Sequence, residues 1–408
     1  MNFKILFSTA LIATSLSTLA QEANRTYAIT GKADNKFFWS EIRQIDMTTG
    51  KVTRVVYENG KTPFVTDGVS SKINGMPAAN NEPMAFGVAA AALDKENNRL
   101  YFTPMHFAQL RYVDLNSKEP KFNYLDVDLL KSPSGGYLTE ESQITRMVIS
   151  ADGYGYGITN DANHLVRFST AKKPVVEDLG NLVDADENKG VSIHNKCTSW
   201  GGDMIADAFG KLYVISANHN VFKVDPVTRI ATHLGTIEGL PANFTSNGAV
   251  VDAAGKIVVS SANTFDGFYK FNLADLKAEK MPSSEPVYNA SDLANGNLLL
   301  QKEADAARNT GRPVLQPVTV TSNDAVSVYP NPVTGTRFNV SISSTPGNYH
   351  IIVADLSGRA LLDQSAFIKS KGQVVAVSFT KAPAKGTYLI KVVNSDNQSI
   401  YSDKIIVQ

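Results

Sequence analysis

Hydrophobic and polar residues alternate in short runs along most of the chain, and Gly, Asn and Asp separate these runs. Alternation with a period of two predicts β-strands with one buried face, whereas a helix needs apolar residues three or four positions apart. Helical periodicity is scarce in this sequence. We therefore expect an all-β protein.

An imperfect group of strands recurs along the chain, with copies at Val88–Ser117, Met147–Ala171, Met204–Thr228 and Ala249–Asp275. Each copy begins with an apolar strand of small residues and turns sharply near Gly or Asn before its second strand. A third strand follows a short polar loop, and a more polar fourth strand often closes the copy. Four-stranded antiparallel units at this period are typical of β-propeller blades, whose innermost strands crowd around a central axis.

The two ends of this region each supply part of a blade. Strand patterns at Tyr27–Thr30, Ser40–Gly50 and Lys51–Glu58 lack an inner strand before them, whereas Asn289–Gln301 has inner strands and lacks outer ones. One blade built from both ends would remove the open edges of the sheet. We favour six blades over five, because Tyr27–Thr30 and the segment NLLLQ both resemble second strands. An open sandwich is the alternative architecture.

Composition and charge narrow the function classes. The 408 residues are 43% hydrophobic and 19% charged, and 39 basic residues balance 39 acidic ones. This balance gives no basic field for nucleic acid or an anionic membrane. The single cysteine, Cys197, cannot form an intrachain disulfide.

The N-terminus has the pattern of a secretory signal. Lys4 precedes an apolar run that starts at Ile5, and small residues follow up to Ala20. We predict a signal peptide at residues 1–20, cleaved between Ala20 and Gln21. A membrane anchor is the alternative, but the apolar run is too short to span a bilayer. No later segment is apolar over the ~20 residues that a membrane-spanning helix needs.

A second unit follows the predicted propeller, which we place at residues 21–301. Residues 302–325 are polar, contain prolines and read as a linker. Strong alternation resumes at residues 326–408, where Phe338, Val340 and Ile342 share one face. Several short strands without a helix predict a small antiparallel sandwich.

This second unit carries the stretches VSVYPNPV, DLSGR, KGTYLIKV and KIIV in that order. It resembles the C-terminal sorting domain of type IX secretion cargo in Bacteroidota. The resemblance covers residues 326–408 and rests on Tyr329, Pro330, Asn331, Pro332, Asp355, Gly358, Gly386 and Tyr388. It implies an Ig-like fold, the outer-membrane secretion machinery as a partner, and a final location on the cell surface or outside the cell. An ordinary Ig-like binding module is the alternative.

Three of the six histidines fall in equivalent loops of the predicted propeller. His106, His164 and His219 lie between the second and third strands of their copies. These loops share a face with the connections between blades, so a ring of His and Asn at the channel mouth would bind a metal or a polar ligand. The alternative is that the repeats share a turn-forming cluster.

The stretch HNKCTSWGGD at His194–Asp203 precedes an inner strand on the same face. His194 and Cys197 form a weak nucleophilic pair, because their spacing sets no orientation. Trp200 before two glycines either forms an aromatic wall of a binding site or packs between blades. The complete set of candidate mouth residues is His106, Arg146, His164, Trp200, Asp203, His219 and Asn247.

No phosphate loop, nucleophile elbow or dinucleotide motif is present in the sequence. The acidic loop Asp184–Asn188 lacks the glycine and the terminal glutamate of an EF-hand, which leaves a looser calcium site or a solvated loop. We otherwise expect no cofactor. Two functions stay open: a propeller that binds an extracellular ligand or partner, or a propeller hydrolase or lyase whose site is the channel mouth. The first is favoured because no acid–base pair can be named from the sequence.

Overall fold

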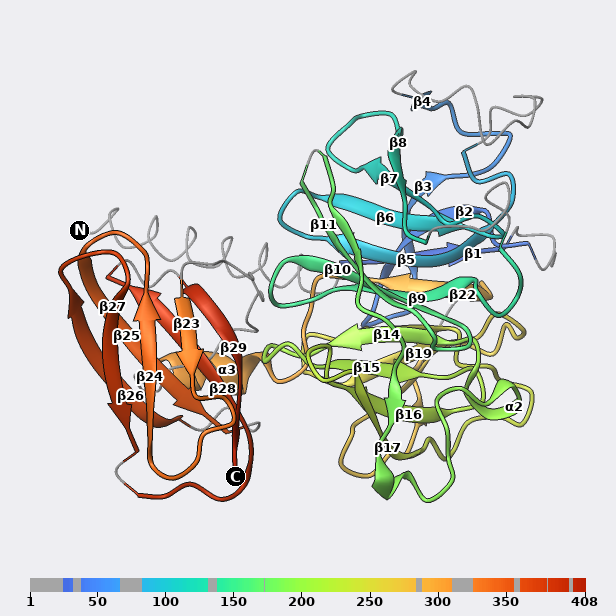
Figure 1. Cartoon of the computed structure of the whole chain (residues 1–408). Helices are drawn as coiled ribbons and strands as arrows, with labels where there is room; N and C mark the ends of the chain where they lie inside the picture. Colours follow the sequence, from blue (N-terminus) through green and yellow to red (C-terminus); the bar gives the residue numbers. More distant parts are fainter. Residues whose placement is uncertain are drawn as a thin grey trace, which may run out of the picture. The chain divides into compact units, whose positions relative to one another are not determined.

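The computed structural model describes residues 25–31, 38–66, 83–130, 138–171, 173–283, 288–309, 326–355, 360–379, 381–395 and 399–408. The predicted signal peptide, with Ala20 and Gln21 at its cleavage point, lies outside these residues, as does Gly358. The chain divides into two units, Met1–Ala306 and Ala307–Gln408 (Figure 1). Among the described residues, no helix is long and apolar enough to cross a membrane.

The described residues of the first unit form five β-sheets, which we number as blades. Blade 1 has the order β22–β1–β2–β3 and consists of β1 (Arg25–Thr30), β2 (Glu41–Asp46), β3 (Val52–Tyr57) and β22 (Ala290–Ala294). Blade 2 has the order β4–β8–β7–β6–β5 and consists of β4 (Val65–Thr66), β5 (Val88–Asp94), β6 (Arg99–Pro104), β7 (Gln109–Asp114) and β8 (Lys121–Asp128).

The other three blades follow in sequence. Blade 3 has the order β12–β11–β10–β9 and consists of β9 (Ile144–Ile149), β10 (Tyr154–Thr159), β11 (Leu165–Ser169) and β12 (Val176–Asp178). Blade 4 has the order β13–β17–β16–β15–β14 and consists of β13 (Val183–Asp184), β14 (Asp203–Ala206), β15 (Leu212–Ile215), β16 (Asn220–Val224) and β17 (Ile230–Thr236). Blade 5 has the order β18–β19–β20–β21 and consists of β18 (Gly248–Val251), β19 (Ile257–Ser260), β20 (Tyr269–Phe271) and β21 (Glu279–Lys280).

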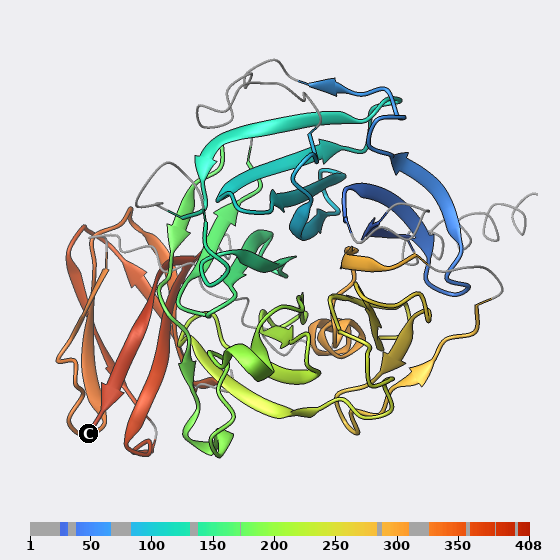
Figure 2. The ribbon, with the colours of Figure 1, turned by 90° about the vertical axis from the view of Figure 1, so that its right-hand side faces the viewer.

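The inner strands of the five blades form a closed ring. β5 contacts β9, β9 contacts β14, β14 contacts β18, β18 contacts β22, and β22 returns to β5. Figure 2 shows the sheets arranged around this common centre. The small residues Ala90, Ala91 and Ala92 of β5 are buried, as the crowding at the axis requires. The β-propeller prediction is therefore confirmed.

Our preference for six blades was wrong for the described residues, in which the ring closes with five. The predicted blade from both chain ends exists, because Tyr27 of β1 pairs with Ala294 of β22. The segment NLLLQ, however, is not a second strand. Leu299 instead bridges Asp207 in parallel beside blade 4, where its backbone bonds those of Ala206 and Ala208. Leu299 of this apolar run is buried, but it packs beside blade 4 and does not form part of a sixth blade.

Within the described residues, three short helices interrupt the strands: η1 (Asp186–Asn188), α2 (Lys196–Ser199) and α3 (Gln301–Asn309). α3 lies where we expected the start of a polar linker. Its sequence, QKEADAARN, is rich in residues with high helix propensity, and Ala304 is buried. Polarity alone therefore did not distinguish a helix from an irregular linker over these residues.

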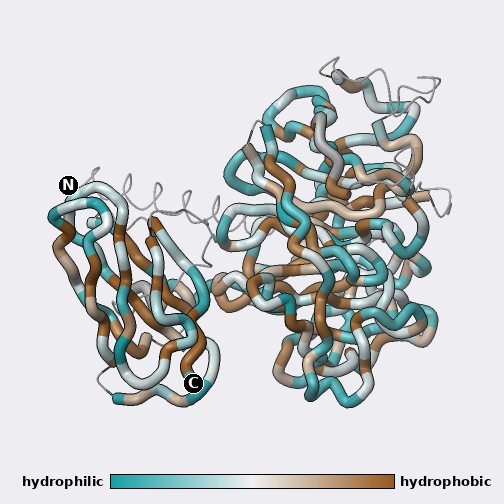
Figure 3. Tube along the Cα trace, in the orientation of Figure 1, coloured by the Kyte–Doolittle hydropathy of each residue, from teal (hydrophilic) through white to brown (hydrophobic). Residues whose placement is uncertain are grey.

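The second unit contains two antiparallel sheets. One has the order β23–β24–β27, from β23 (Val326–Tyr329), β24 (Arg337–Ile342) and β27 (Gln373–Ser378). The other has the order β26–β25–β28–β29, from β25 (Gly347–Ala354), β26 (Ala360–Ile368), β28 (Gly386–Asn394) and β29 (Ser399–Val407). Phe338, Val340 and Ile342 enter the shared core, as their alternation predicted. Figure 3 shows hydrophobic stretches along the strands of each unit.

Candidate functional site

A cavity of ≈ 240 Å³ lies at one mouth of the central channel, and all five blades contribute to its wall. Blade 1 supplies Trp39 and Ser291, and blade 5 supplies Asn247 and Ala262. The loops between second and third strands and the connections into inner strands meet here, as the repeat pattern predicted. We call this space the mouth cavity.

β-Bulges aim three residues into the mouth cavity. In blade 3, Ile158 pairs with Arg146 but Thr159 pairs with Ile144, so Thr145 has no partner across the ladder. The same skip leaves Ser291 unpaired in blade 1 and Ala89 unpaired in blade 2. All three residues line the cavity. Bulges redirect side chains and are frequent beside functional sites.

A close approach of backbone to backbone shapes the blade 4 side of the mouth cavity. Gly201 and Gly202 line it with φ values of +66° and +88°. A Cβ on Gly202 would lie 1.9 Å from the carbonyl oxygen of Ile215. Asn160 of blade 3 secures this side, because its Oδ1 accepts from the Gly201 amide at 2.9 Å. This part of the wall is therefore rigid.

Blades 1 and 5 form another side of the cavity wall, with Trp39, Ser291 and Asn247. Trp39 Nε1 and Ser291 Oγ are themselves enclosed by the protein and have no hydrogen-bond partner among the residues that the structure describes. The Asn247 side chain accepts from the Ala262 amide through Oδ1 at 3.1 Å, which turns its amide nitrogen away from that contact.

The opposite side of the cavity carries a histidine and a carboxylate. His106 and Glu140 both line it. The His106 backbone is fixed by Gln143, whose Oε1 accepts from its amide at 2.5 Å, and by Leu138, whose amide donates to its carbonyl at 2.7 Å. Glu140 is exposed and pairs with Lys196 of α2 at 2.7 Å.

Arg146, a predicted mouth residue, lies beneath the cavity and is fully buried. Its guanidinium donates to the backbone carbonyls of Ser199 at 2.6 Å, Gly201 at 2.9 Å and Thr159 at 3.2 Å. Burial lowers the pKa of Arg146 to about 10, so it stays charged at neutral pH. The side chain ties blade 3 to the approach to blade 4 and does not line the cavity.

Asp203, another predicted mouth residue, is also buried beneath the cavity. Its carboxylate accepts from the backbone amides of Met204 and Ala249, each at 2.7 Å. Asp292 holds the equivalent position on the inner strand of blade 1. Asp203 pairs with Ile215 on its second strand, and Asp292 pairs with Ile29 on its own second strand. Each of these two isoleucines precedes a hydroxyl residue.

Asp203 and Asp292 form a buried carboxyl pair. Burial raises the pKa of both groups well above the ordinary value, and the Asp203 charge raises that of Asp292 further. Neither Asp292 oxygen has a hydrogen-bond partner by geometry among the described residues, although the nearby Ala91 amide opposes the rise in its pKa. The charge of one buried carboxylate favours the protonated form of a second carboxyl near it. We expect Asp292 to carry the proton, since Asp203 has the amide donors and the nearby Arg146 charge.

The expected ring of histidines does not form, because only His106 of the three lines the mouth cavity. His164 is 44% exposed in its side chain and pairs with Asp178 at 2.7 Å. His219 turns its ring to the Phe244 carbonyl, 2.6 Å from Nε2. Both rings have partners outside their own loops, Asp178 on β12 for His164 and Phe244 in the connection from β17 to β18 for His219.

Trp200 also departs from the expected mouth position. Its indole Nε1 donates to the His194 carbonyl at 3.0 Å, and Lys196 Nζ lies 4.7 Å from its ring centroid. Asn247 and His106 are therefore the predicted mouth residues that do line the cavity. Sequence reasoning missed Trp39, Glu140 and Ser291. Asp292 was also missed, although aligning the fifth inner strand with those of Arg146 and Asp203 would have found it.

The remaining chemical candidates are engaged elsewhere. His194 contacts the carbonyls of Asp161 and Leu182, at 2.6 and 3.1 Å, so its ring is held away from the exposed Cys197. In the acidic loop, Asp184 Oδ1 accepts from the Ile193 amide at 2.9 Å. No group of three or more His, Cys, Asp or Glu side chains in the described part of the chain is placed to hold a metal ion.

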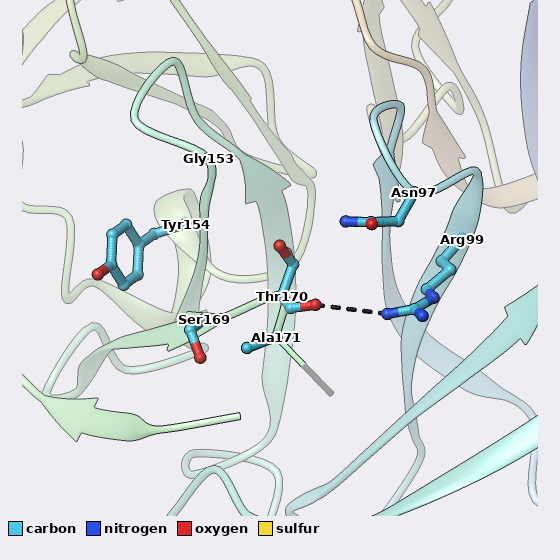
Figure 4. Close-up of a pocket in the computed structure, with 7 residues that line it drawn as sticks. All are labelled: Asn97, Arg99, Gly153, Tyr154, Ser169, Thr170 and Ala171. Carbon is cyan, nitrogen blue, oxygen red and sulfur yellow. Dashed lines mark hydrogen bonds between the residues drawn. The ribbon is translucent and has the colours of Figure 1, made fainter. Parts of the chain in front are cut away.

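A second cavity of ≈ 550 Å³ lies between blades 2 and 3 (Figure 4). It is lined by Asn97 and Gly153 from turns between first and second strands, together with Arg99, Tyr154 and the segment Ser169–Ala171. The Arg99 guanidinium donates to the Thr170 carbonyl at 3.4 Å and lies 4.8 Å from the Tyr112 ring. The Arg99 guanidinium is thus already shared between two partners.

In the second unit, the stretch YPNPV binds the last strand. Asn331 donates to the Lys404 carbonyl and accepts from the Ile406 amide, both at 2.9 Å. Tyr329 ends β23, and Pro330 and Pro332 flank Asn331 without amide hydrogens of their own. The Tyr388 hydroxyl donates to the Ala384 carbonyl at 2.7 Å, Gly386 begins β28, and Asp355 follows β25. The motif therefore ties the start of this unit to its C-terminal strand.

Comparison with known families identifies this second unit. Residues 327–408 match the family described as the secretion system C-terminal sorting domain. The chain carries a type IX secretion sorting domain. Such a domain implies interaction with the secretion machinery and export to the cell surface or secretion.

Whole-chain comparisons are more distant. No curated protein matches the chain. PorZ, a bacterial surface component of the type-IX secretion system of Porphyromonas gingivalis, is 15% identical over 94% of this chain and 51% of its own, with a TM-score of 0.33. Virginiamycin B lyase from Staphylococcus aureus is 11% identical over 79% of this chain and 85% of its own, with a TM-score of 0.31. The chain spans about half the length of PorZ, and neither likeness is close enough to carry a function.

Proposed function

We propose that this protein is an exported β-propeller that binds an extracellular ligand in its mouth cavity. One observation carries the proposal: the wall of the mouth cavity is built by residues from all five blades. A cavity at the end of a channel, where several loops converge, is a usual place for a ligand.

The volume of the mouth cavity limits what enters it. At ≈ 240 Å³ it is smaller than the roughly 300–1,000 Å³ of sites that enclose a drug-sized ligand. It suits one unit or end group of a larger molecule, with the rest of that molecule outside the mouth.

A binding screen with a filled cavity tests the proposal. The secreted protein is exposed to a panel of extracellular polysaccharides and peptides, in parallel with Ala89→Leu, which adds bulk at the bulge that lines the mouth. Ala171→Leu is the matched control, because Ala171 lines the second cavity. We expect Ala89→Leu to abolish capture of a ligand that Ala171→Leu retains. Equal capture by both variants would place the site elsewhere.

A hydrolase or lyase at the same mouth is the second candidate, because His106 and Glu140 line one cavity and are residue types used in acid–base catalysis. The binding function is preferred since Glu140 is held by Lys196 at 2.7 Å on the exposed rim. Turnover of a captured ligand that disappears in both His106→Gln and Glu140→Gln would favour the enzyme.

A further inference from the structure

The second cavity, between blades 2 and 3, brings polar side chains of both blades together. Its volume of ≈ 550 Å³ falls within the roughly 300–1,000 Å³ of pockets that hold small ligands. Asn97 and Arg99 come from blade 2, and the segment Ser169–Ala171 comes from blade 3. The side chains of Asn97 and Arg99 both point across the gap towards Thr170 (Figure 4). Groups from two blades thus converge on one space that is large enough for a ligand.

Arg99 is held in one orientation and keeps N–H groups for a ligand. A guanidinium carries five N–H groups. One of them reaches the Thr170 carbonyl at 3.4 Å, and the Tyr101 hydroxyl engages another. The Tyr112 ring, whose centroid lies 4.8 Å from the guanidinium carbon, holds the planar group by a cation–π contact. These contacts with described residues orient the guanidinium and use only some of its N–H groups.

The Thr170 carbonyl is a weak partner for this guanidinium. Its oxygen accepts from Arg99 at 3.4 Å and from the Tyr101 hydroxyl at 3.3 Å, whereas hydrogen bonds of these kinds are most often about 2.7–3.0 Å long. A carboxylate forms shorter and stronger bonds to a guanidinium than a carbonyl does, and it accepts two parallel N–H groups at once. A ligand carboxylate therefore competes successfully with Thr170 for Arg99.

The groups beside Arg99 suit hydroxyl partners. The Asn97 side-chain nitrogen donates to Asp94 Oδ2 at 2.7 Å, and the Asn97 backbone amide donates to Asp94 Oδ1 at 3.1 Å, which fixes the Asn97 side chain in its turn. A side-chain amide both donates and accepts, and so does the hydroxyl of Thr170. Sugar hydroxyls have the same double capacity, so they complement both groups.

We propose that the second cavity binds an acidic sugar, whose carboxylate pairs with Arg99 and whose hydroxyls bond Asn97 and Thr170. A sugar is preferred to an acidic peptide because it supplies a carboxylate and several hydroxyls within a single unit. The residues that line this cavity differ from those that line the mouth cavity. The site is therefore additional to the proposed function and does not depend on it.

Calorimetry on the secreted protein tests this inference with trigalacturonate, neutral galactotriose and the peptide triglutamate. We expect trigalacturonate to bind more tightly than galactotriose by roughly 10-fold or more, because hydrogen bonds between charged partners are stronger than neutral ones. Added salt should weaken the binding of trigalacturonate, since the contact lies in an open cavity where ions screen it. Triglutamate should bind more weakly than trigalacturonate.

Variants of the cavity wall locate the binding. Arg99→Gln should abolish the preference for trigalacturonate, and Arg99→Lys should weaken binding, because lysine keeps the charge and loses the planar fork. Ala171→Leu fills the cavity with Arg99 intact, so it decides the result if Arg99→Gln does not fold. Arg54→Gln is the matched control, since Arg54 is exposed on β3 of blade 1 and does not line the cavity. Binding should be unchanged in this control.

Several outcomes would overturn the inference. Equal affinity for the acidic and the neutral sugar, or no measurable binding of either, would remove the role of the carboxylate. Equal losses in Arg99→Gln and Arg54→Gln would show an effect of net charge without a site. Tighter binding of triglutamate than of trigalacturonate would overturn the sugar. Loss of trigalacturonate binding in Ala89→Leu, with binding retained in Ala171→Leu, would place the acidic sugar in the mouth cavity.

Discussion

Replacement of Asp292 by asparagine should remove the pH dependence that this residue imposes on the stability of the propeller. Asp292 is fully buried on β22, and both burial and the Asp203 charge raise its pKa. In the unfolded chain, the same carboxyl ionises near its ordinary pKa of about 3.9. Between these two values, folding takes up a proton. The contribution of Asp292 to stability is therefore complete below about pH 4 and is lost as the pH rises towards the raised pKa.

The size of the effect follows from this proton count. Each proton taken up on folding lowers the free energy of unfolding by about 1.4 kcal/mol per pH unit. Asparagine does not titrate, so Asp292→Asn removes that slope. The variant should thus gain about 1.4 kcal/mol over the wild type for each pH unit in which the folded pair keeps its proton.

Urea unfolding at pH 5, 6, 7 and 8 measures this difference. The chain has two tryptophans, Trp39 and Trp200, and both lie in the first unit, so their fluorescence follows the propeller alone. Other titrating groups are common to both proteins and cancel in the comparison. Asp203→Asn is the contrasting variant, since an amide nitrogen would replace an acceptor that the Met204 and Ala249 amides use. It should destabilise the propeller at every pH.

A constant difference between Asp292→Asn and the wild type across this range would refute the raised pKa of Asp292. So would a loss of stability in Asp292→Asn that grows with pH, because it would mean that the folded protein uses an ionised Asp292. Either result would also change the charge that we assign to the floor of the mouth cavity.

Three further outcomes are expected. Gly202→Ala should lower the free energy of unfolding by about 1–3 kcal/mol through its positive φ, and further through the clash with the Ile215 backbone. Gly190 has the same φ of +88° but no atom within 4 Å of an added Cβ. Gly190→Ala should therefore show only the first effect in urea unfolding. Arg146→Met should cost about 3–5 kcal/mol, read as a fall in Tm, because buried carbonyls lose a charged donor. Deletion of residues 326–408 should leave the protein in the periplasm by cell fractionation, and unchanged export would contradict the role of the sorting domain.

The sequence was sufficient where a pattern repeats. Alternation identified the strands, the recurring small-residue strand identified the propeller, and the order of short motifs identified the sorting domain. These features depend on local periodicity, which a single chain displays directly. The blade count failed at NLLLQ because an apolar run near a chain end specifies burial without specifying a partner. Leu299 is buried as expected, but against blade 4.

The mouth cavity shows the complementary limit. Its position followed from topology, since loops between second and third strands share a face with the connections between blades. The direction of each side chain did not follow from topology. A bulge at Ser291 and a backbone contact at Gly202 both depend on pairing between strands that are distant in sequence. His164 and His106 occupy equivalent loop positions, yet only His164 has Asp178 beside it. Repeats thus conserve where a loop lies, whereas the neighbours of each copy decide which side chains remain available to a ligand.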